Sequence, residues 1–253
     1  MRNDYIAVMD SGIGGISVLR ALKDAFPNER FLYYGDNYNA PYGNRSVQNL
    51  LSLSMRNIDY IKSFGVKAVV LACNTLSVNL IHDICAYSGL PIFGVFPPVE
   101  SCIIAGEKTL LMATVRTAEN YKSDKNVDVI GLPTLVNSIE KNTTDLSRVD
   151  FSKILSESAV GNFINRKGYY NTVILGCTHY EFIKNQIFDH FCPQKIICGH
   201  FFTIKIVEKF LKINKSSVNY NDFDVLFVGE NSLLNQNFWE KSGQSILKTT
   251  KKL

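Results

Sequence analysis

Two cysteines stand in the same local sequence context, one in each half of the chain. Each follows a short apolar run and precedes two polar side chains, in Val69-Val70-Leu71-Ala72-Cys73-Asn74-Thr75 and Val173-Ile174-Leu175-Gly176-Cys177-Thr178-His179. A cysteine is an acid when it carries its proton and a base when it is a thiolate. Two such groups on opposite sides of one carbon could remove a proton from one face and deliver another to the opposite face. The pair therefore suggests acid–base chemistry at a single carbon.

The apolar runs before these cysteines indicate buried parallel strands. Helical patterns follow at residues 78–87 and 182–191, so each thiol is expected where a strand ends and a helix begins. Ligands bind at that edge of open α/β sheets, and the positive end of a helix dipole favours a thiolate. We expect Cys73 and Cys177 to face each other across a cleft. A lone cysteine is more often a small buried residue, and we assign that role to Cys85, Cys102, Cys192 and Cys198.

A glycine loop near the N-terminus offers a different function. Gly12 and Gly14 follow the first expected strand and precede a helix, and Asp36 ends the next strand. This arrangement is close to a dinucleotide-binding fingerprint. However, Ser17 replaces the third glycine, and Asp10 would place a carboxylate near a pyrophosphate. A phosphate loop of the ATPase type is not expected, because no Gly-Lys-Ser/Thr sequence follows.

Two Cys-x-His pairs, Cys177-x-His179 and Cys198-x-His200, raise the question of a metal site. Zinc sites usually place two to four residues between cysteines or three to five between histidines. Neither spacing occurs here, so we expect no metal.

Composition and charge are those of an ordinary globular protein. The 253 residues are 46% hydrophobic and 20% charged, and the formal net charge is +4, which favours neither disorder nor a nucleic-acid partner. No apolar run approaches the roughly 20 residues of a membrane span, and the N-terminus has no secretory signal. The six cysteines lie far apart, which favours free thiols in a reducing cytoplasm over disulfides. We therefore expect a cytoplasmic protein with a small-molecule substrate and no membrane partner.

Strand and helix patterns alternate along the chain, which predicts an α/β fold of two similar lobes. Each lobe is expected to be a mainly parallel sheet covered by helices, with the active site in the cleft between them. Pro97-Pro98 marks the first crossing between lobes. The first lobe is expected to span residues 1–97 and to be completed by residues 212–253, and the second to span residues 98–211. Among the helices, we expect a long one from Ser46 to about Phe64 and another over residues 151–166.

Five motifs occur in order along residues 6–180. They are Asp10-Ser11-Gly12-x-Gly14-Gly15, Tyr34-Gly35-Asp36, Pro41-Tyr42-Gly43, Ala72-Cys73-Asn74-Thr75 and Leu175-Gly176-Cys177-Thr178-His179-Tyr180. Each is weak alone, but the set resembles glutamate racemase, of the aspartate/glutamate racemase superfamily. The chain departs from the family pattern at three places. Leu76 replaces a small residue, Glu181-Phe182 replaces Pro-Leu, and Gly199-His200-Phe201 stands where an Asp-Ser-type motif is usual.

The resemblance implies interconversion of L- and D-glutamate without a cofactor, supplying D-glutamate for peptidoglycan. Cys73 would remove the proton of D-glutamate and Cys177 that of L-glutamate. Asp10 could assist Cys73, and His179 could assist Cys177, with Glu140 near His179. The residues expected to bind substrate are Asp10, Ser11, Pro41, Tyr42, Gly43, Asn74, Thr75, Thr117, Thr178 and His179. A homodimer is also implied.

Three alternatives stay open at this point. A related racemase could act on another amino acid such as aspartate, because the sequence does not give the pocket size. The glycine loop could belong to a nucleotide-binding module. A catalytically weakened relative could act as a binding or regulatory protein.

Overall fold

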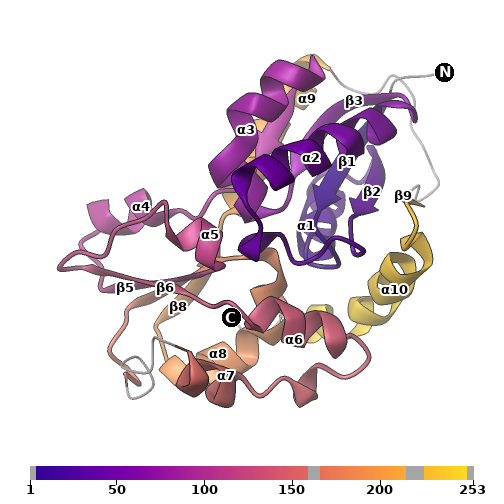
Figure 1. The fold of residues 1–253 in the computed structure, drawn as a ribbon. Helices are drawn as coiled ribbons and strands as arrows, with labels where there is room; N and C mark the ends of the chain where they lie inside the picture. Colours follow the sequence, from indigo (N-terminus) through magenta and orange to yellow (C-terminus); the bar gives the residue numbers. More distant parts are fainter. Residues whose placement is uncertain (1–3, 159–165, 215–224, 250–253) are drawn as a thin grey trace.

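The structure, a computed structural model, describes residues 4–158, 166–214 and 225–249. The strands in these ranges form two parallel sheets (Figure 1). The first sheet has the order β4-β3-β1-β2-β9 and the second the order β6-β5-β7-β8, which confirms the expected two-lobe α/β fold. The strands are β1 (Tyr5–Asp10), β2 (Arg30–Gly35), β3 (Val66–Leu71), β4 (Ile92–Gly94), β5 (Thr109–Ala113), β6 (Val127–Gly131), β7 (Thr172–Gly176), β8 (Lys195–Cys198) and β9 (Val225–Val228).

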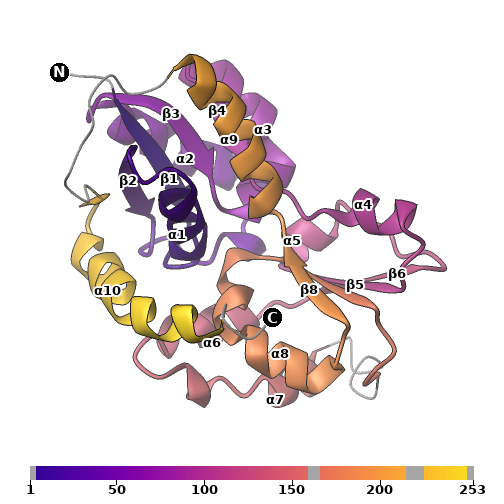
Figure 2. The same cartoon turned by 180° about the vertical axis from the view of Figure 1, so that it is seen from behind.

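Helices cover both faces of the first sheet. Figure 2 shows α1 (Ile16–Ala25) and α9 (His200–Ile213) in front of it, with α2 (Val47–Lys62) and α3 (Asn74–Ser88) behind. Side chains alternate across a strand, so Ile6 and Val8 pack in the α1 cluster, whereas Ala7 and Met9 pack with α2 and α3. Because both faces are buried, the strands read as continuous apolar runs.

The second sheet is covered in the same way. Val99 and Cys102 of α4 (Val99–Ile104) pack with Leu111 of β5 on one face. The helices α6 (Leu135–Lys141), α7 (Phe151–Glu157) and α8 (Lys184–Phe191) pack on the other face with Leu110 and Met112. Two short connections complete this lobe, α5 (Val115–Ala118) and the 3-10 segment η2 (Leu146–Arg148).

Local signals account for several helix ends. Ser46 Oγ accepts a hydrogen bond from Asn49 N at 3.2 Å and so caps α2, and Gly65, at φ +69°, follows its last turn.

Two predictions differ from the structure. The helix expected over residues 151–166 ends at Glu157, and residues 159–165 lie outside the described ranges. Residues 178–183 form the 3-10 helix η4 (Thr178–Ile183), so the α-helix after Cys177 begins only at Lys184.

The chain leaves the first lobe after β4 and returns to it after β8. On the return, α9 packs against the first sheet, where Thr203 Oγ1 donates to Gly94 O at 2.9 Å and the rings of Phe93 and Phe210 lie 5.4 Å apart. The predicted limit at residue 211 falls inside this helix. The lobe limits at residues 97 and 211 stay a prediction.

The last described helix, α10 (Ser232–Thr249), follows β9 and reaches the second lobe. The ring of Phe238 lies 4.8 Å from that of Phe182 in η4. Among the described helices, none is sufficiently long and apolar to span a membrane.

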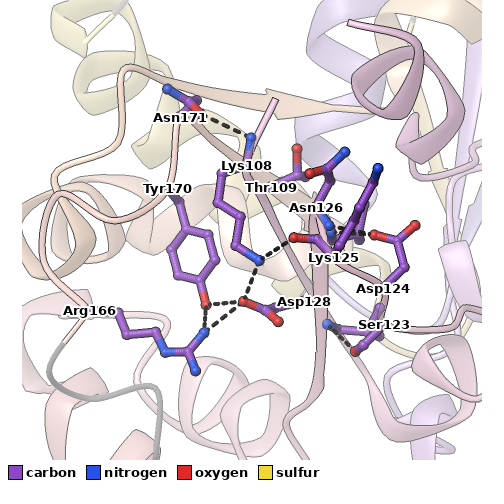
Figure 3. Close-up of polar contacts among 12 residues, drawn as sticks. Lys108, Thr109, Ser123, Asp124, Lys125, Asn126, Asp128, Arg166, Tyr170 and Asn171 are labelled. Atoms are coloured by element: carbon purple, nitrogen blue, oxygen red, sulfur yellow. Dashed lines mark hydrogen bonds and ion pairs between the residues drawn. The ribbon is translucent and has the colours of Figure 1, made fainter. Parts of the chain in front are cut away.

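An ion-pair network stabilises the amino-terminal edge of the second sheet (Figure 3). Asp128 Oδ2 accepts hydrogen bonds from Arg166 Nη1 at 2.7 Å and Tyr170 Oη at 2.9 Å, and lies 3.4 Å from Lys108 Nζ. This edge is opposite to the strand ends that carry the cysteines. We interpret the network as structural, because it fastens the segment before β7 to the start of β6.

Candidate active site

Cys73 and Cys177 line the same cavity between the lobes. Cys73 follows β3 and immediately precedes α3, and Cys177 follows β7 and immediately precedes η4. Both are free cysteines, with exposed fractions of 5% and 6%. The other residues that line the cavity come from the carboxyl edges of both sheets: Ser11, Pro41, Tyr42, Gly43, Asn74, Thr75, Thr114, Val136, Thr178 and His179.

The cavity between the cysteines is small. Its volume is about 10 Å³, which is room for about one water molecule. An amino acid is several times larger, so a substrate can enter only if the lobes or the lining side chains move apart. A larger depression of about 620 Å³ lies over Asp36, Arg56 and Glu230, but neither cysteine lines it.

Cys73 is held as a thiol by its surroundings. Burial, and after it the nearby Asp10 carboxylate, raises the pKa of Cys73 well above its usual range. The backbone N–H groups of Leu76 and Thr75, in the first turn of α3, act in the opposite direction but do not reverse the shift. The start of α3 therefore lowers the pKa of Cys73, as the sequence suggests, but desolvation outweighs this effect.

Cys177 is the first member of a chain of three polar groups. His179 Nδ1 lies 3.8 Å from its sulfur, and His179 Nε2 lies 2.7 Å from Glu140 Oε1. Burial lowers the pKa of His179, but the contacts with Cys177 and Glu140 outweigh it and leave that pKa well above its ordinary value. Burial likewise raises the pKa of Glu140, but the hydrogen bonds from His179 and from Ile13 N give it a net lowered pKa. An ionised carboxylate thus faces a histidine that can exchange a proton with Cys177.

Asp10 is buried and is not among the residues that line the cavity. Its Oδ1 accepts from Gly12 N at 3.1 Å and from Ser11 Oγ at 3.3 Å, and its Oδ2 accepts from Thr178 Oγ1 at 3.1 Å. Burial raises the pKa of Asp10, although the charge of His179 opposes this shift. Asp10 therefore links the first lobe to Thr178 of the second and acts on Cys73 through its charge.

Side chains of the second lobe occupy the space beside the glycine loop. A Cβ at Gly12 would lie 1.9 Å from Glu140 Oε1, and a Cβ at Gly14 would lie 2.4 Å from His179 Nδ1. These glycines thus allow the second lobe to approach the loop closely. The place where a pyrophosphate would bind holds a carboxylate and an imidazole instead, which argues against the nucleotide-binding alternative.

Three threonine hydroxyls join the lobes beside the cavity. Thr75 Oγ1 lies 3.0 Å from Thr114 Oγ1 and 3.3 Å from Thr117 Oγ1. Sequence reasoning selected Thr75 and Thr117 but missed Thr114, although Thr114 follows β5 at the same carboxyl edge as Cys177 follows β7. It also missed Val136, whose apolar side chain gives no chemical signal.

Two expected substrate-binding side chains have polar groups engaged elsewhere. Tyr42, in the 3-10 segment η1 (Tyr42–Asn44), donates its hydroxyl to Asp36 Oδ2 at 2.5 Å. Asn74 Nδ2 donates to Val95 O at 2.9 Å. Both residues line the cavity, but these donors hold the walls together rather than point to a ligand.

Comparisons with known proteins identify the family. The chain is 34% identical over 227 residues to a glutamate racemase of Clostridium perfringens (strain 13 / Type A), covering 85% of both proteins. It is 31% identical to that of Clostridium novyi (strain NT) over an alignment of 266 positions, covering 98% of this chain and 96% of the relative. The chain belongs to the glutamate racemase family. No family model matches it.

Solved structures of this family share the fold. The glutamate racemase from Thermus thermophilus in complex with β-chloro-D-alanine has a TM-score of 0.72 at 25% identity, covering 95% of this chain and 93% of that one. The enzyme from Francisella tularensis in complex with D-glutamate has a TM-score of 0.74 at 23% identity, covering 95% of both chains. The second likeness supports the fold alone.

Proposed function

We propose that this chain interconverts L- and D-glutamate without a cofactor, using Cys73 and Cys177 as its two acid–base groups. The observation that carries the proposal is that one free, buried cysteine from each lobe lines the same cavity. Glutamate as the substrate is supported by the relatives of the two Clostridium species, which are named glutamate racemases.

Each turnover makes one S–H bond and breaks another. A thiolate takes the proton from the α-carbon, and the electron pair of the C–H bond stays on that carbon. The thiol of the second cysteine then protonates the opposite face and becomes a thiolate. We assign Cys177 to L-glutamate and Cys73 to D-glutamate. The raised pKa of Cys73 supports a resting state in which Cys73 is the thiol and the reaction of L-glutamate begins at Cys177.

His179 and Glu140 would prepare Cys177 for this step. His179 Nδ1 is placed to accept the Cys177 proton, since its Nε2 donates to Glu140 Oε1 at 2.7 Å. The Glu140 carboxylate would balance the charge of the imidazolium that forms. Glu140 acts through His179, so we regard it as a positioning residue.

The charge that develops on the substrate carboxylate needs hydrogen-bond donors. The first N–H groups of α3 lack partners within the helix, and the hydroxyls of Ser11, Thr75 and Thr178 lie at the same cavity. Thr117 would act on the substrate through Thr75. The contacts of Asp10 support a positioning role, in which its carboxylate orients Ser11 and Thr178.

Substrate binding must enlarge the cavity, and we propose that the lobes separate to admit glutamate and then close. Closure would remove water from the two sulfurs and strengthen the electrostatic contacts around the carbanion.

Replacing each cysteine by serine tests the proposal. We expect Cys73→Ser and Cys177→Ser each to lower kcat/KM by at least about 100-fold, because a serine hydroxyl is a far weaker acid than a thiol. Racemisation is followed by circular dichroism, starting from L-glutamate and from D-glutamate. Aspartate is tested separately as an alternative substrate. Cys85→Ser is the matched control, since Cys85 is half-buried on α3 and does not line the cavity.

Two results would contradict the proposal. One is a Cys73→Ser or Cys177→Ser variant that keeps most of its activity. The other is faster turnover of aspartate than of glutamate, which would favour the alternative amino acid. The homodimer, the cytoplasmic location and the supply of D-glutamate to peptidoglycan stay predictions.

A further inference from the structure

Three side chains that can ligate a metal meet where the chain returns from the second lobe to the first. They are Glu181, Cys198 and His200, and their ligand atoms all lie within 4.8 Å of one another. Glu181 Oε1 is 3.3 Å from His200 Nδ1. Cys198 and His200 are buried, with exposed fractions of 8% and 7%. Within the part of the chain whose side chains are described, no other group of three such residues is found.

The three residues come from three elements, two of the second lobe and one helix that returns to the first. Glu181 lies in η4, Cys198 ends β8, and His200 begins α9, which packs against the first sheet. Gly199 stands between two of them, and a Cβ there would lie 1.9 Å from Phe96 O. The return crossing therefore touches the outgoing crossing at Phe96. The cluster sits at the junction about which the lobes would move.

The donor atoms suit zinc better than other common ions. A thiolate sulfur, an imidazole nitrogen and a carboxylate oxygen are all zinc ligands, whereas magnesium and calcium prefer oxygen alone. Ligand atoms of a tetrahedral zinc ion stand roughly 3.3–3.7 Å apart, given zinc–ligand distances of about 2.0–2.3 Å. The observed spacing needs only small side-chain movements to reach that geometry, and a water molecule could complete the fourth position.

The cluster is separate from the two-cysteine site and absent from the family pattern. Glu181 and His200 stand at positions where the sequence departs from the glutamate racemase motifs. Sequence spacing pointed away from zinc because the usual Cys–Cys and His–His spacings of zinc sites do not occur. Only the fold brings Glu181 to Cys198 and His200.

We propose that Glu181, Cys198 and His200 bind one zinc ion that joins α9 to the second lobe. The ion would link η4 and β8 directly to the helix that returns to the first sheet. Because η4 also carries Thr178 and His179, the same ion would help to fix the position of the second-lobe half of the active site.

Cobalt and zinc titrations of the purified full chain, after treatment with a chelator, test this site. We expect one equivalent of Co²⁺ to bind and to give a thiolate-to-cobalt charge-transfer band, which zinc then removes by displacement. The active-site thiols could also bind metal, so the titration is repeated on the Cys73→Ser/Cys177→Ser double variant. The band is expected to persist there and to disappear in Cys198→Ser. Cys102→Ser, which changes another buried cysteine of the second lobe, should keep it.

Milder variants keep the test valid if Cys198→Ser does not fold. Glu181→Gln and His200→Gln are each expected to weaken zinc binding by more than about 10-fold. Zinc should raise the Tm of the wild-type chain, because it binds only the folded state, and at the same zinc concentration should raise the Tm of the His200→Gln variant less. The proposal is overturned if the wild-type chain takes up no equivalent of metal. It is also overturned if the cobalt band survives Cys198→Ser or is lost in the double variant.

Discussion

Replacing Glu140 by glutamine removes a charge from the Cys177 side of the site and keeps the shape of the side chain. Glu140 Oε1 accepts from His179 Nε2 at 2.7 Å and from Ile13 N at 3.0 Å. A hydrogen bond to a charged group contributes about 1.5–3 kcal/mol and one to a neutral group about 0.5–1.5 kcal/mol. Glutamine retains an acceptor oxygen, so the hydrogen bond with His179 becomes weaker by about 1–1.5 kcal/mol and is not lost. That corresponds to a roughly 5-fold to 13-fold fall in kcat/KM.

Racemisation provides an internal check on this measurement. The two enantiomers of glutamate have equal free energies in water, so kcat/KM must fall by the same factor in both directions. The primary isotope effect measured with α-deuterated substrate should instead change by different amounts for L- and D-glutamate. If Cys177 removes the proton of L-glutamate, Glu140→Gln should increase the isotope effect for L-glutamate more than for D-glutamate.

Glu208→Gln is the matched control for this substitution. Glu208 lies on α9, where its carboxylate is 3.6 Å from Lys212 Nζ and 54% exposed, and such surface pairs contribute little. We expect its kcat/KM to equal that of the wild-type chain. The reasoning is refuted if folded Glu140→Gln retains wild-type kcat/KM, or if its isotope effects change equally for both enantiomers.

Two further predictions follow from the same contacts. The raised pKa of His179 contributes stability below the unfolded pKa of about 6.5 that is lost as pH rises through the folded value. The lowered pKa of Glu140 contributes stability above about pH 4.3 that is lost as pH falls through its folded value. In urea unfolding, the free energy of unfolding of the wild type should therefore exceed that of Glu140→Gln by the most between about pH 4.5 and 6.5. A difference that grows toward pH 9 would contradict this. Gly14→Ala should lower kcat/KM by more than about 100-fold, because its Cβ would lie 2.4 Å from His179 Nδ1. Gly89→Ala, at φ +65° with nothing near its Cβ, should cost about 1 kcal/mol in unfolding free energy and leave activity unchanged; equal activities of the two variants would contradict the close approach.

Local sequence patterns were sufficient to place both thiols at the carboxyl edge of parallel sheets. The apolar run before Cys73 has the length of a buried strand, and β3 ends two residues before it. The same reasoning located Cys177 after β7, and Ser46 and Gly65 marked the ends of α2. These features depend on hydrophobic period, strand length and capping, which neighbouring residues determine.

Tertiary structure alone decided how each thiol is surrounded. Glu140 meets His179 across 39 positions of sequence, and the space beside Gly12 is filled only because the second lobe packs there. The helix start at Cys73 suggested a thiolate, yet burial removes water from the sulfur, and the pairing of β1 with β3 places Asp10 near it. Both effects raise the pKa of Cys73. Desolvation and charge depend on what lies within a few ångströms in space. In this protein, those neighbours are far apart in the sequence, and some of them, such as Glu140 beside Gly12, belong to the opposite lobe, which no local pattern in the sequence records.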